Sequence, residues 1–292
     1  PLTIEHNNYF ANANNTRQWG IIHEPISIQI YEKLYQTRVA DFGCIPHPKY
    51  SCIGASPDGI NVDPASGRFG RMIEVKNIVN REITGIPKEE HWIQMQIQME
   101  TCDLDECDFI ETRFKEFDSS SDFYLFDTKL ENPWNTWRGV YLCFLEKVES
   151  DVPIYVPKFE YMPIDEIPIE KHAVEAWIDA VCAKYKHTHI LYTTHYWYLD
   201  EFSCILVKRN RMWFQAILPK ILDTWRTIEE ERQTGYEHRA AKKRAPPIGS
   251  GSNGSTLHVH LSREIEIADT FAPTTNEEKE DIKTGDIRVV NI

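Results

Sequence analysis

The sequence predicts an α/β fold, in which a mixed central β-sheet is flanked by helices and followed by a helical C-terminal portion with a flexible tail. Short stretches rich in β-branched and aromatic residues alternate with stretches whose apolar residues recur every three or four positions, which indicates strands and helices in turn. Residues 249–255 read Gly-Ser-Gly-Ser-Asn-Gly-Ser, which is typical of a flexible linker and marks the end of the folded region.

The first elements are two short strands enclosed by two helices. Residues 19–35 are expected to form a helix because their apolar residues have helical spacing, and Pro25 lies near the start, where a helix tolerates proline. Strands are expected over 52–59 and 72–78. Glycines between them predict a turn and therefore an antiparallel hairpin. A second helix follows over 89–102.

The second half continues the alternation. Strands are expected over 107–117, 139–147, 154–162 and 190–199, and helices over 169–185 and 213–232, with an exposed insertion over 118–136. We therefore expect one folded domain over 1–235, and a flexible linker and tail over 236–292.

Composition limits the classes of protein to consider. With 292 residues, 41% of them apolar, the chain can bury a sizeable core. No stretch approaches the roughly 18 apolar residues of a membrane span, and no signal peptide is visible, so we expect an intracellular protein without a membrane partner. Seven cysteines are expected to be free thiols. The net charge of −13 argues against a nucleic-acid partner, although a protein that binds nucleic acid needs only a local basic groove.

Two acids and a lysine carry the chemistry that the sequence predicts. Glu74 and Lys76 are two residues apart, so on a strand both side chains point to the same face. The hairpin would bring Asp58 opposite Glu74, and Pro57 and Gly59 fix the backbone around it. Carboxylate and carbonyl oxygens are the ligands that Mg²⁺ prefers.

Each piece alone has an ordinary explanation, because a Pro-Asp-Gly turn and an exposed Glu/Lys pair are common on protein surfaces. In this order, and followed by a glutamine-rich helix, they favour a metal-dependent nuclease site. Asp58, Glu74 and the Val75 carbonyl would suit Mg²⁺, which could activate water for attack on a phosphodiester. Lys76 would stabilise the charge of the transition state.

Four segments together resemble the lambda-type exonuclease family, the YqaJ-like viral recombinases of the PD-(D/E)xK nuclease superfamily, in the form carried by large cytoplasmic DNA viruses. They are Trp-Gly-Ile-Ile-His-Glu-Pro at 19–25, Gly-Ala-Ser-Pro-Asp-Gly at 54–59, Glu-Val-Lys at 74–76 and Gln-Met-Gln-Ile-Gln-Met at 94–99. The resemblance covers about residues 19–117 and implies a restriction-endonuclease-like core. It also implies a role for each site residue: Asp58, Glu74 and the Val75 carbonyl as metal ligands, Lys76 as the catalytic lysine, and Glu24, Ser56 and Gln94 as residues that shape the site.

The resemblance further implies Mg²⁺-dependent 5′→3′ digestion of double-stranded DNA with free ends, with Mn²⁺ as a substitute ion. The setting would be viral DNA recombination, repair or replication in the host cytoplasm. It leaves room for a homo-oligomer and for a single-strand annealing or replication partner, although no segment identifies an interface. Related enzymes hold the terminal 5′-phosphate with an upstream Arg-and-Ser segment that has no counterpart before Trp19, so polarity rests on the resemblance alone.

Two other functions fit the same residues. One is a structure-selective endonuclease that uses the same site, and the other is a non-catalytic DNA-binding module. Some assignments also stay open. Gln98 could contact the site or cap a polar groove, Lys208, Arg209 and Arg211 could bind phosphates or be solvated, and Trp134 and Trp137 could stack on unpaired bases.

Overall fold

The computed structural model describes residues 16–126, 132–148, 154–164, 166–239 and 288–290. The chain divides into two compact units, of which the first runs to Phe214 and includes residues 288–290, and the second begins at Gln215. The expected linker and tail lie mostly outside the described residues, so that prediction stays a prediction. Within the described residues, each helix is too short or too polar to cross a bilayer.

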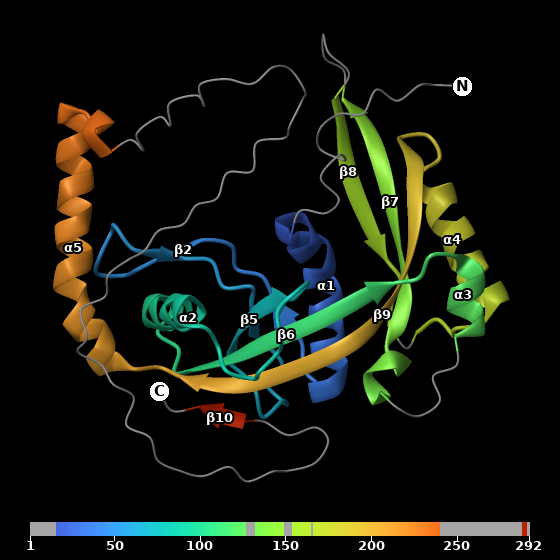
Figure 1. Ribbon diagram of the computed structural model, residues 1–292, viewed down its shortest axis with the longest axis horizontal. Helices are drawn as coiled ribbons and strands as arrows, with labels where there is room; N and C mark the ends of the chain where they lie inside the picture. Colours follow the sequence, from blue (N-terminus) through green and yellow to red (C-terminus); the bar gives the residue numbers. More distant parts are fainter. Residues whose placement is uncertain (1–15, 127–131, 149–153, 165, 240–287, 291–292) are drawn as a thin grey trace, which may run out of the picture. The chain divides into compact units, whose positions relative to one another are not determined.

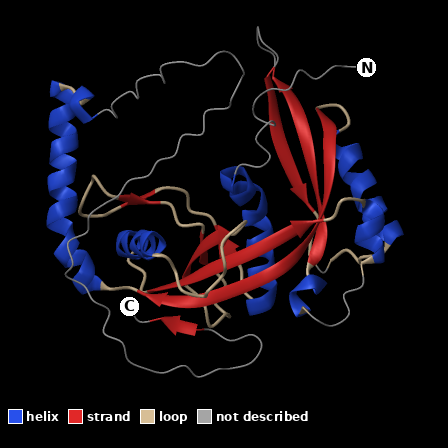
Figure 2. Cartoon of the chain, in the orientation of Figure 1, coloured by secondary structure: helices blue, strands red, loops and turns tan. Residues whose placement is uncertain are grey.

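A large, curled mixed sheet organises the first unit (Figures 1 and 2). Its strand order is β1 (Val39–Ala40), β4 (Gly59–Asn61), β5 (Met72–Asn77), β6 (Glu106–Glu116), β9 (His189–Lys208), β7 (Arg138–Val148) and β8 (Ile154–Tyr161), and β10 (Arg288–Val290) also pairs with β9. The β5–β6 and β9–β10 pairs are parallel and the others are antiparallel. A separate two-stranded sheet contains β2 (Ile45–Pro46) and β3 (Gly54–Ala55). The predicted mixed sheet flanked by helices is confirmed.

The first two helices cover opposite faces of the sheet. Helix α1 (Thr16–Tyr35) buries Tyr31 in a cluster with Ile73 of β5, whereas α2 (Glu89–Cys102) buries Met95 in a different cluster with Met72. Met72 and Ile73 are neighbours on one strand, so their side chains point to opposite faces. Strand β5 therefore lies between α1 and α2, and by the same alternation Glu74 faces α2.

The remaining helices follow the predicted order with one correction. Helix α3 (Ser120–Leu125) and the 3₁₀ turn η1 (Pro133–Thr136) lie in the segment that was expected to be an exposed insertion, and then come α4 (Lys171–Tyr185), α5 (Arg211–Thr234) and the 3₁₀ turn η2 (Glu237–Arg239). Phe123 is fully buried, and Trp134 packs against Phe202 with their ring centroids 5.1 Å apart. Trp137 packs in the same cluster. Both tryptophans are partly buried against this cluster, so the structure favours a packing role over base stacking.

Strand β9 is longer than its sequence predicts. The expected strand ends at residue 199, but β9 continues to Lys208, and its second half pairs with the full length of β6, from Glu116↔Trp197 to Glu106↔Lys208. A bulge between Arg113 and Phe114 shifts the register. The polar residues around Asp200 and Glu201 hide the strand in the sequence, and pairing with β6 supplies the stabilisation that local propensity does not.

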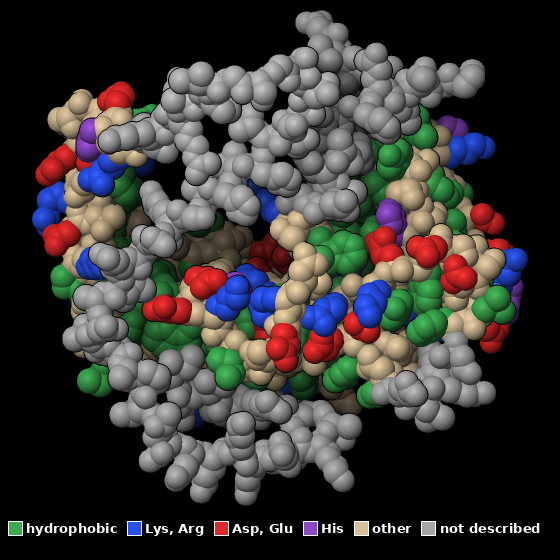
Figure 3. All heavy atoms as spheres, viewed as in Figure 1, with side chains coloured by type: hydrophobic (Ala, Val, Ile, Leu, Met, Phe, Trp, Pro, Cys, Tyr) green, Lys and Arg blue, Asp and Glu red, His purple; other side chains and the backbone are tan. Residues whose placement is uncertain are grey.

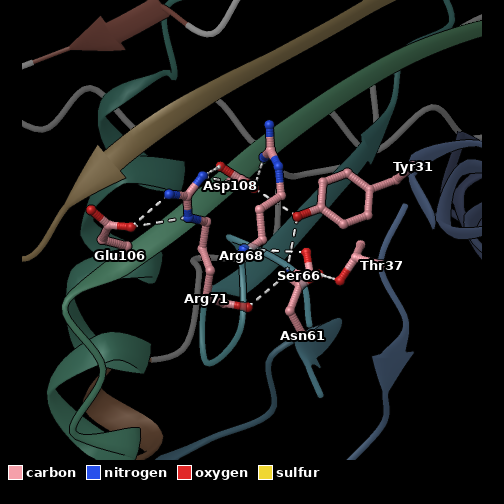
Figure 4. Close-up of polar contacts among 8 residues, drawn as sticks. All are labelled: Tyr31, Thr37, Asn61, Ser66, Arg68, Arg71, Glu106 and Asp108. Carbon is pink, nitrogen blue, oxygen red and sulfur yellow. Dashed lines mark hydrogen bonds and ion pairs between the residues drawn. The ribbon is translucent and has the colours of Figure 1, made fainter. Parts of the chain in front are cut away.

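A buried polar network on the α1 face fixes the β4–β5 turn to the sheet (Figure 4). Asp108 of β6 accepts a hydrogen bond from the Tyr31 hydroxyl at 2.6 Å, forms an ion pair with Arg68 and accepts from Arg71 Nη1 at 3.1 Å. Asn61 of β4 donates to the Tyr31 hydroxyl at 3.0 Å and to the Arg71 carbonyl at 2.8 Å. The network joins α1, β4, the turn and β6, and so holds the segment in which the predicted metal ligands lie.

Candidate active site

The candidate site lies at the edge of β5, beyond the residues that pair with β4. Strand β4 pairs only with the start of β5, through Gly59↔Ile73 and Ile60↔Met72, and continuing this register places Asp58 opposite Glu74, as predicted. Asp58 Oδ2 accepts a hydrogen bond from the Val75 N–H at 2.7 Å. The N–H and C=O of one strand residue point to the same side, so the Val75 carbonyl opens onto the edge where Asp58 lies.

Gly59 lets β4 approach its neighbours at this point. A Cβ atom at residue 59 would collide with the Val39 side chain of β1 and lie 3.4 Å from Ile73. Because Gly59 directly follows Asp58, the close approach of β1 also fixes where the Asp58 carboxylate lies. The neighbour that requires glycine here is the Val39 side chain of β1.

Glu74 is the centre of the site. Its carboxylate is fully buried, and Oε1 accepts from Lys76 Nζ and from Gln94 Nε2, the latter at 2.9 Å. Oε2 accepts from Gln98 Nε2 at 3.0 Å. Gln94 and Gln98 are four residues apart on α2 and so share a face of the helix. Strand β5 and helix α2 thus bring the predicted residues Glu74, Lys76 and Gln94 together.

Gln98 also connects the site to the loop before Asp58. Its Nε2 donates to the Ser56 carbonyl at 3.3 Å, in addition to its bond with Glu74. The contact of Ser56 with the site is therefore through its main chain, and the residue itself is exposed. Gln96 points elsewhere, toward the Lys208 carbonyl at 3.0 Å and the Asn210 N–H at 2.6 Å. Gln96 therefore has a structural role, in which it joins α2 to the end of β9.

Glu24 reaches the site from the other helix. It lines a cleft of about 570 Å³ together with Val75 and Lys76. Burial raises the pKa of Glu24, and the negative charge of Glu74 raises that pKa further. Glu24 on α1 and Gln94 on α2 therefore approach the open edge of β5 from the two faces of the sheet.

The charges that line this cleft are mostly positive. Arg17, Lys76, Arg81 and Lys88 contribute cations, and Glu24 is the acid among the lining residues. Lys and Arg side chains also gather across the middle of the face drawn in Figure 3, where acidic side chains lie among them. A chain with a net charge of −13 therefore presents a locally basic cleft, which is the property that a phosphate-bearing ligand needs.

The residues present fit a hard divalent cation. Two carboxylates and the Val75 carbonyl form an all-oxygen donor set, and Mg²⁺ is commonly held by one or two carboxylates while it keeps several waters. Partial burial, together with the charge of the fully buried Glu74, raises the pKa of Asp58 to about 7, because the two carboxylates repel each other. A cation between them would offset this repulsion. Within the described residues, no three His, Cys, Asp or Glu side chains form a ready metal cluster, so water and main chain would complete the coordination.

The sequence did not identify Arg17, Arg81, Lys88 or His91 as residues of this cleft, and it left the role of Gln98 open. His91, Gln94 and Gln98 have the spacing i, i+3 and i+7, which places all three on one face of α2. That spacing could have identified His91. Arg81 lies in the loop between β5 and α2, where no periodicity reveals it, and it forms an ion pair with the buried Glu111.

The basic residues before α5 have a structural role. Arg209 Nε donates to Glu100 at 2.8 Å and its Nη1 donates to Asp103 at 2.8 Å, and Arg211 Nη2 donates to Asp105 at 2.9 Å. These pairs tie the end of β9 to the end of α2. For Arg209 and Arg211 the structure therefore favours ion pairing over phosphate binding.

Comparisons with known proteins agree with the motifs. Residues 3–105 match the model of the YqaJ-like viral recombinase domain. An uncharacterised protein of Acanthamoeba polyphaga mimivirus, R354, is 27% identical over 244 residues, which cover 73% of this chain and 43% of that protein. The chain thus spans less than half the length of this curated relative.

Solved structures of one enzyme also align with the chain. The alkaline exonuclease of Laribacter hongkongensis aligns with a TM-score of 0.40 and 18% identity, over 78% of this chain and 81% of that chain. The same enzyme in complex with dAMP aligns with a TM-score of 0.40 and 18% identity, over 79% of this chain and 85% of that chain.

Proposed function

We propose that this chain, whose residues 3–105 match the model of the YqaJ-like viral recombinase domain, is a metal-dependent DNA nuclease. The observation that carries the proposal is the convergence of Asp58, Glu74 and Lys76 at the open edge of β5, beside a cleft lined mainly by cations. A binding module would gain nothing from burying two acids against each other beside a lysine, because their repulsion costs stability.

In the proposed reaction each residue has a distinct task. Asp58, Glu74 and the Val75 carbonyl would hold Mg²⁺, or Mn²⁺ in its place, and the bound ion supplies an activated water and charge stabilisation. Gln94 and Gln98 hold the Glu74 carboxylate in a fixed orientation through their amide N–H groups. Lys76 is paired with Glu74 and lines the cleft, so its ammonium can neutralise charge on the phosphodiester in the transition state.

Duplex DNA with free ends is the substrate that we propose, digested in the 5′→3′ direction by an exonuclease. The local basic character of the cleft supports a phosphodiester substrate, and the recombinase family supports DNA. The biological setting that follows is viral recombination, repair or replication in the host cytoplasm. This setting is compatible with a second copy of the chain and with a single-strand annealing or replication protein as partners.

The test uses one DNA sequence in two forms. Linear duplexes labelled at the 5′ end or the 3′ end of one strand, with and without a 5′-phosphate, and a covalently closed circle are each incubated with the full chain and Mg²⁺. We expect early release of the 5′ label as short products and an intact circle. Cutting of the circle would support the endonuclease instead, and binding of the linear duplex without hydrolysis would support the binding module. Early release of the 3′ label would refute the proposed polarity.

A further inference from the structure

His91 lines the cleft, and its contacts within the described residues do not satisfy one of its ring nitrogens. It lies in the first turn of α2, and its ring packs beside Phe109 with the centroids 5.7 Å apart. Its Nδ1 atom is buried and has no hydrogen-bond partner in the described part of the chain. An unpaired buried nitrogen destabilises a protein, and an apolar ring would pack on Phe109 without that cost.

The place of His91 on α2 points to the cleft. His91, Gln94 and Gln98 share one face of α2. Gln94 and Gln98 both donate hydrogen bonds to the Glu74 carboxylate on β5. His91 lies one helical turn before Gln94 and lines the cleft with Lys76. Since Nδ1 is buried, Nε2 is the ring nitrogen that can serve a ligand in the cleft.

The chemical state of the ring fits a hydrogen-bond donor. Burial, followed by the charge of Lys76, lowers the pKa of His91 to about 4. At neutral pH the imidazole is therefore uncharged and carries one N–H. The cleft also contains Arg17, Arg81 and Lys88, which select an anionic ligand. A neutral N–H beside Lys76 adds a directed hydrogen bond to this field without adding charge.

We propose that His91 is a further catalytic residue, which donates an Nε2–H hydrogen bond to a non-bridging oxygen of the phosphodiester that Lys76 also contacts. No proton is transferred, so the imidazole stays neutral throughout. The bond strengthens as charge develops on the phosphate oxygens, and His91 therefore acts on the rate of hydrolysis more than on DNA affinity. This inference rests on the proposed nuclease function.

Two variants separate the donor from the ring. His91→Phe keeps a planar ring against Phe109 and removes the N–H, whereas His91→Gln keeps a neutral N–H donor at about the reach of Nε2. His172→Phe is the matched control, because that histidine lies on α4 with an 81% exposed side chain. We expect His91→Phe to lower kcat about 10- to 100-fold, with the affinity for duplex DNA, measured by fluorescence anisotropy in EDTA, nearly unchanged. His91→Gln should recover most of the rate.

The results distinguish the inference from the function on which it rests. If the natural chain hydrolyses DNA and Lys76→Ala does not, but His91→Phe keeps the natural kcat, the role of His91 is refuted and the nuclease stands. Equal loss in His91→Phe and His91→Gln would indicate packing and also refute it, as would a change confined to DNA affinity. An inert natural chain would overturn both proposals.

A measurement on the substrate covers the case in which a variant folds poorly. A phosphorothioate at the scissile linkage replaces a non-bridging oxygen and weakens the hydrogen bond that it accepts. We expect this replacement to slow the natural chain more than it slows His91→Phe, because the two changes remove the same contact and are not additive. Equal slowing of both proteins would show that His91 does not contact that oxygen.

Discussion

Replacing Asp108 by alanine tests how firmly the β4–β5 turn is held. The Asp108 carboxylate is fully buried and is paired with Arg68, whose side chain is only 8% exposed. Asp108→Ala leaves that guanidinium buried without its partner and removes the acceptor of the Tyr31 hydroxyl. Breaking a buried pair in this way costs about 3–5 kcal/mol. We expect the free energy of unfolding to fall by that amount.

The matched control is a neighbouring acid in the same network (Figure 4). Glu106 pairs with Arg71 at 2.7 Å, but its side chain is 40% exposed, and Arg71 keeps its contact with Asp108 when Glu106 is removed. Glu106→Ala should therefore cost less than about 1 kcal/mol. Guanidinium unfolding followed by tryptophan fluorescence and far-ultraviolet circular dichroism measures both changes. Equal losses in the two variants would refute the argument that burial decides the cost.

Three further perturbations follow from the same geometry. Gln98→Leu removes the donor to Glu74 Oε2 and should lower kcat about tenfold; a folded variant with the natural kcat would exclude this role. Gly59→Ala forces a Cβ against Val39 and should lower the free energy of unfolding by about 1–3 kcal/mol. Gly67→Ala is the control and should change stability little, because a Cβ at residue 67 meets no atom within 4 Å. Equal losses in the two variants would contradict the steric argument. Burial lowers the pKa of His23 to about 4, so the unfolded state binds more protons as pH falls below 6.5, and stability is lost through that range. His23→Phe should remove about 2.5 kcal/mol of this loss by pH 4.5, and parallel stability curves for the two proteins would refute the assignment.

Local patterns predicted β5 and α2, whereas the strand expected over 52–59 is divided between β3 and β4, which lie in different sheets. Helix 89–102 and strand 72–78 agree with α2 and β5 to within a residue because their patterns are strong over their full lengths. The end of β9 was missed because its stabilisation comes from pairing with β6, a contact between residues about 90 positions apart in sequence. The role of Trp134 and Trp137 stayed open for a similar reason, since only the fold shows that they pack against a buried cluster.

The sequence could predict those site residues that follow the regular spacing of a strand, a hairpin or a helix. Glu74 and Lys76 share a strand face, and the hairpin register places Asp58 opposite Glu74, so simple geometry brings them together. The Asp108 network could not be foreseen, because it joins α1, β4, a turn and β6 through side chains that follow no common spacing. Arg81 likewise lies in a loop, where its place in the cleft depends on an ion pair with Glu111.

Digestion of linear duplex DNA by the natural chain and by Lys76→Ala, each with Mg²⁺ and with EDTA, tests the central claim most directly. We predict that the natural chain releases nucleotides with Mg²⁺ and none in EDTA. Lys76→Ala should keep its fold and its DNA affinity while its rate falls at least about 100-fold, because the charge that stabilises the transition state is gone. DNA degradation that persists at the natural rate in Lys76→Ala would contradict the assignment of the active site to the Asp58, Glu74 and Lys76 cluster.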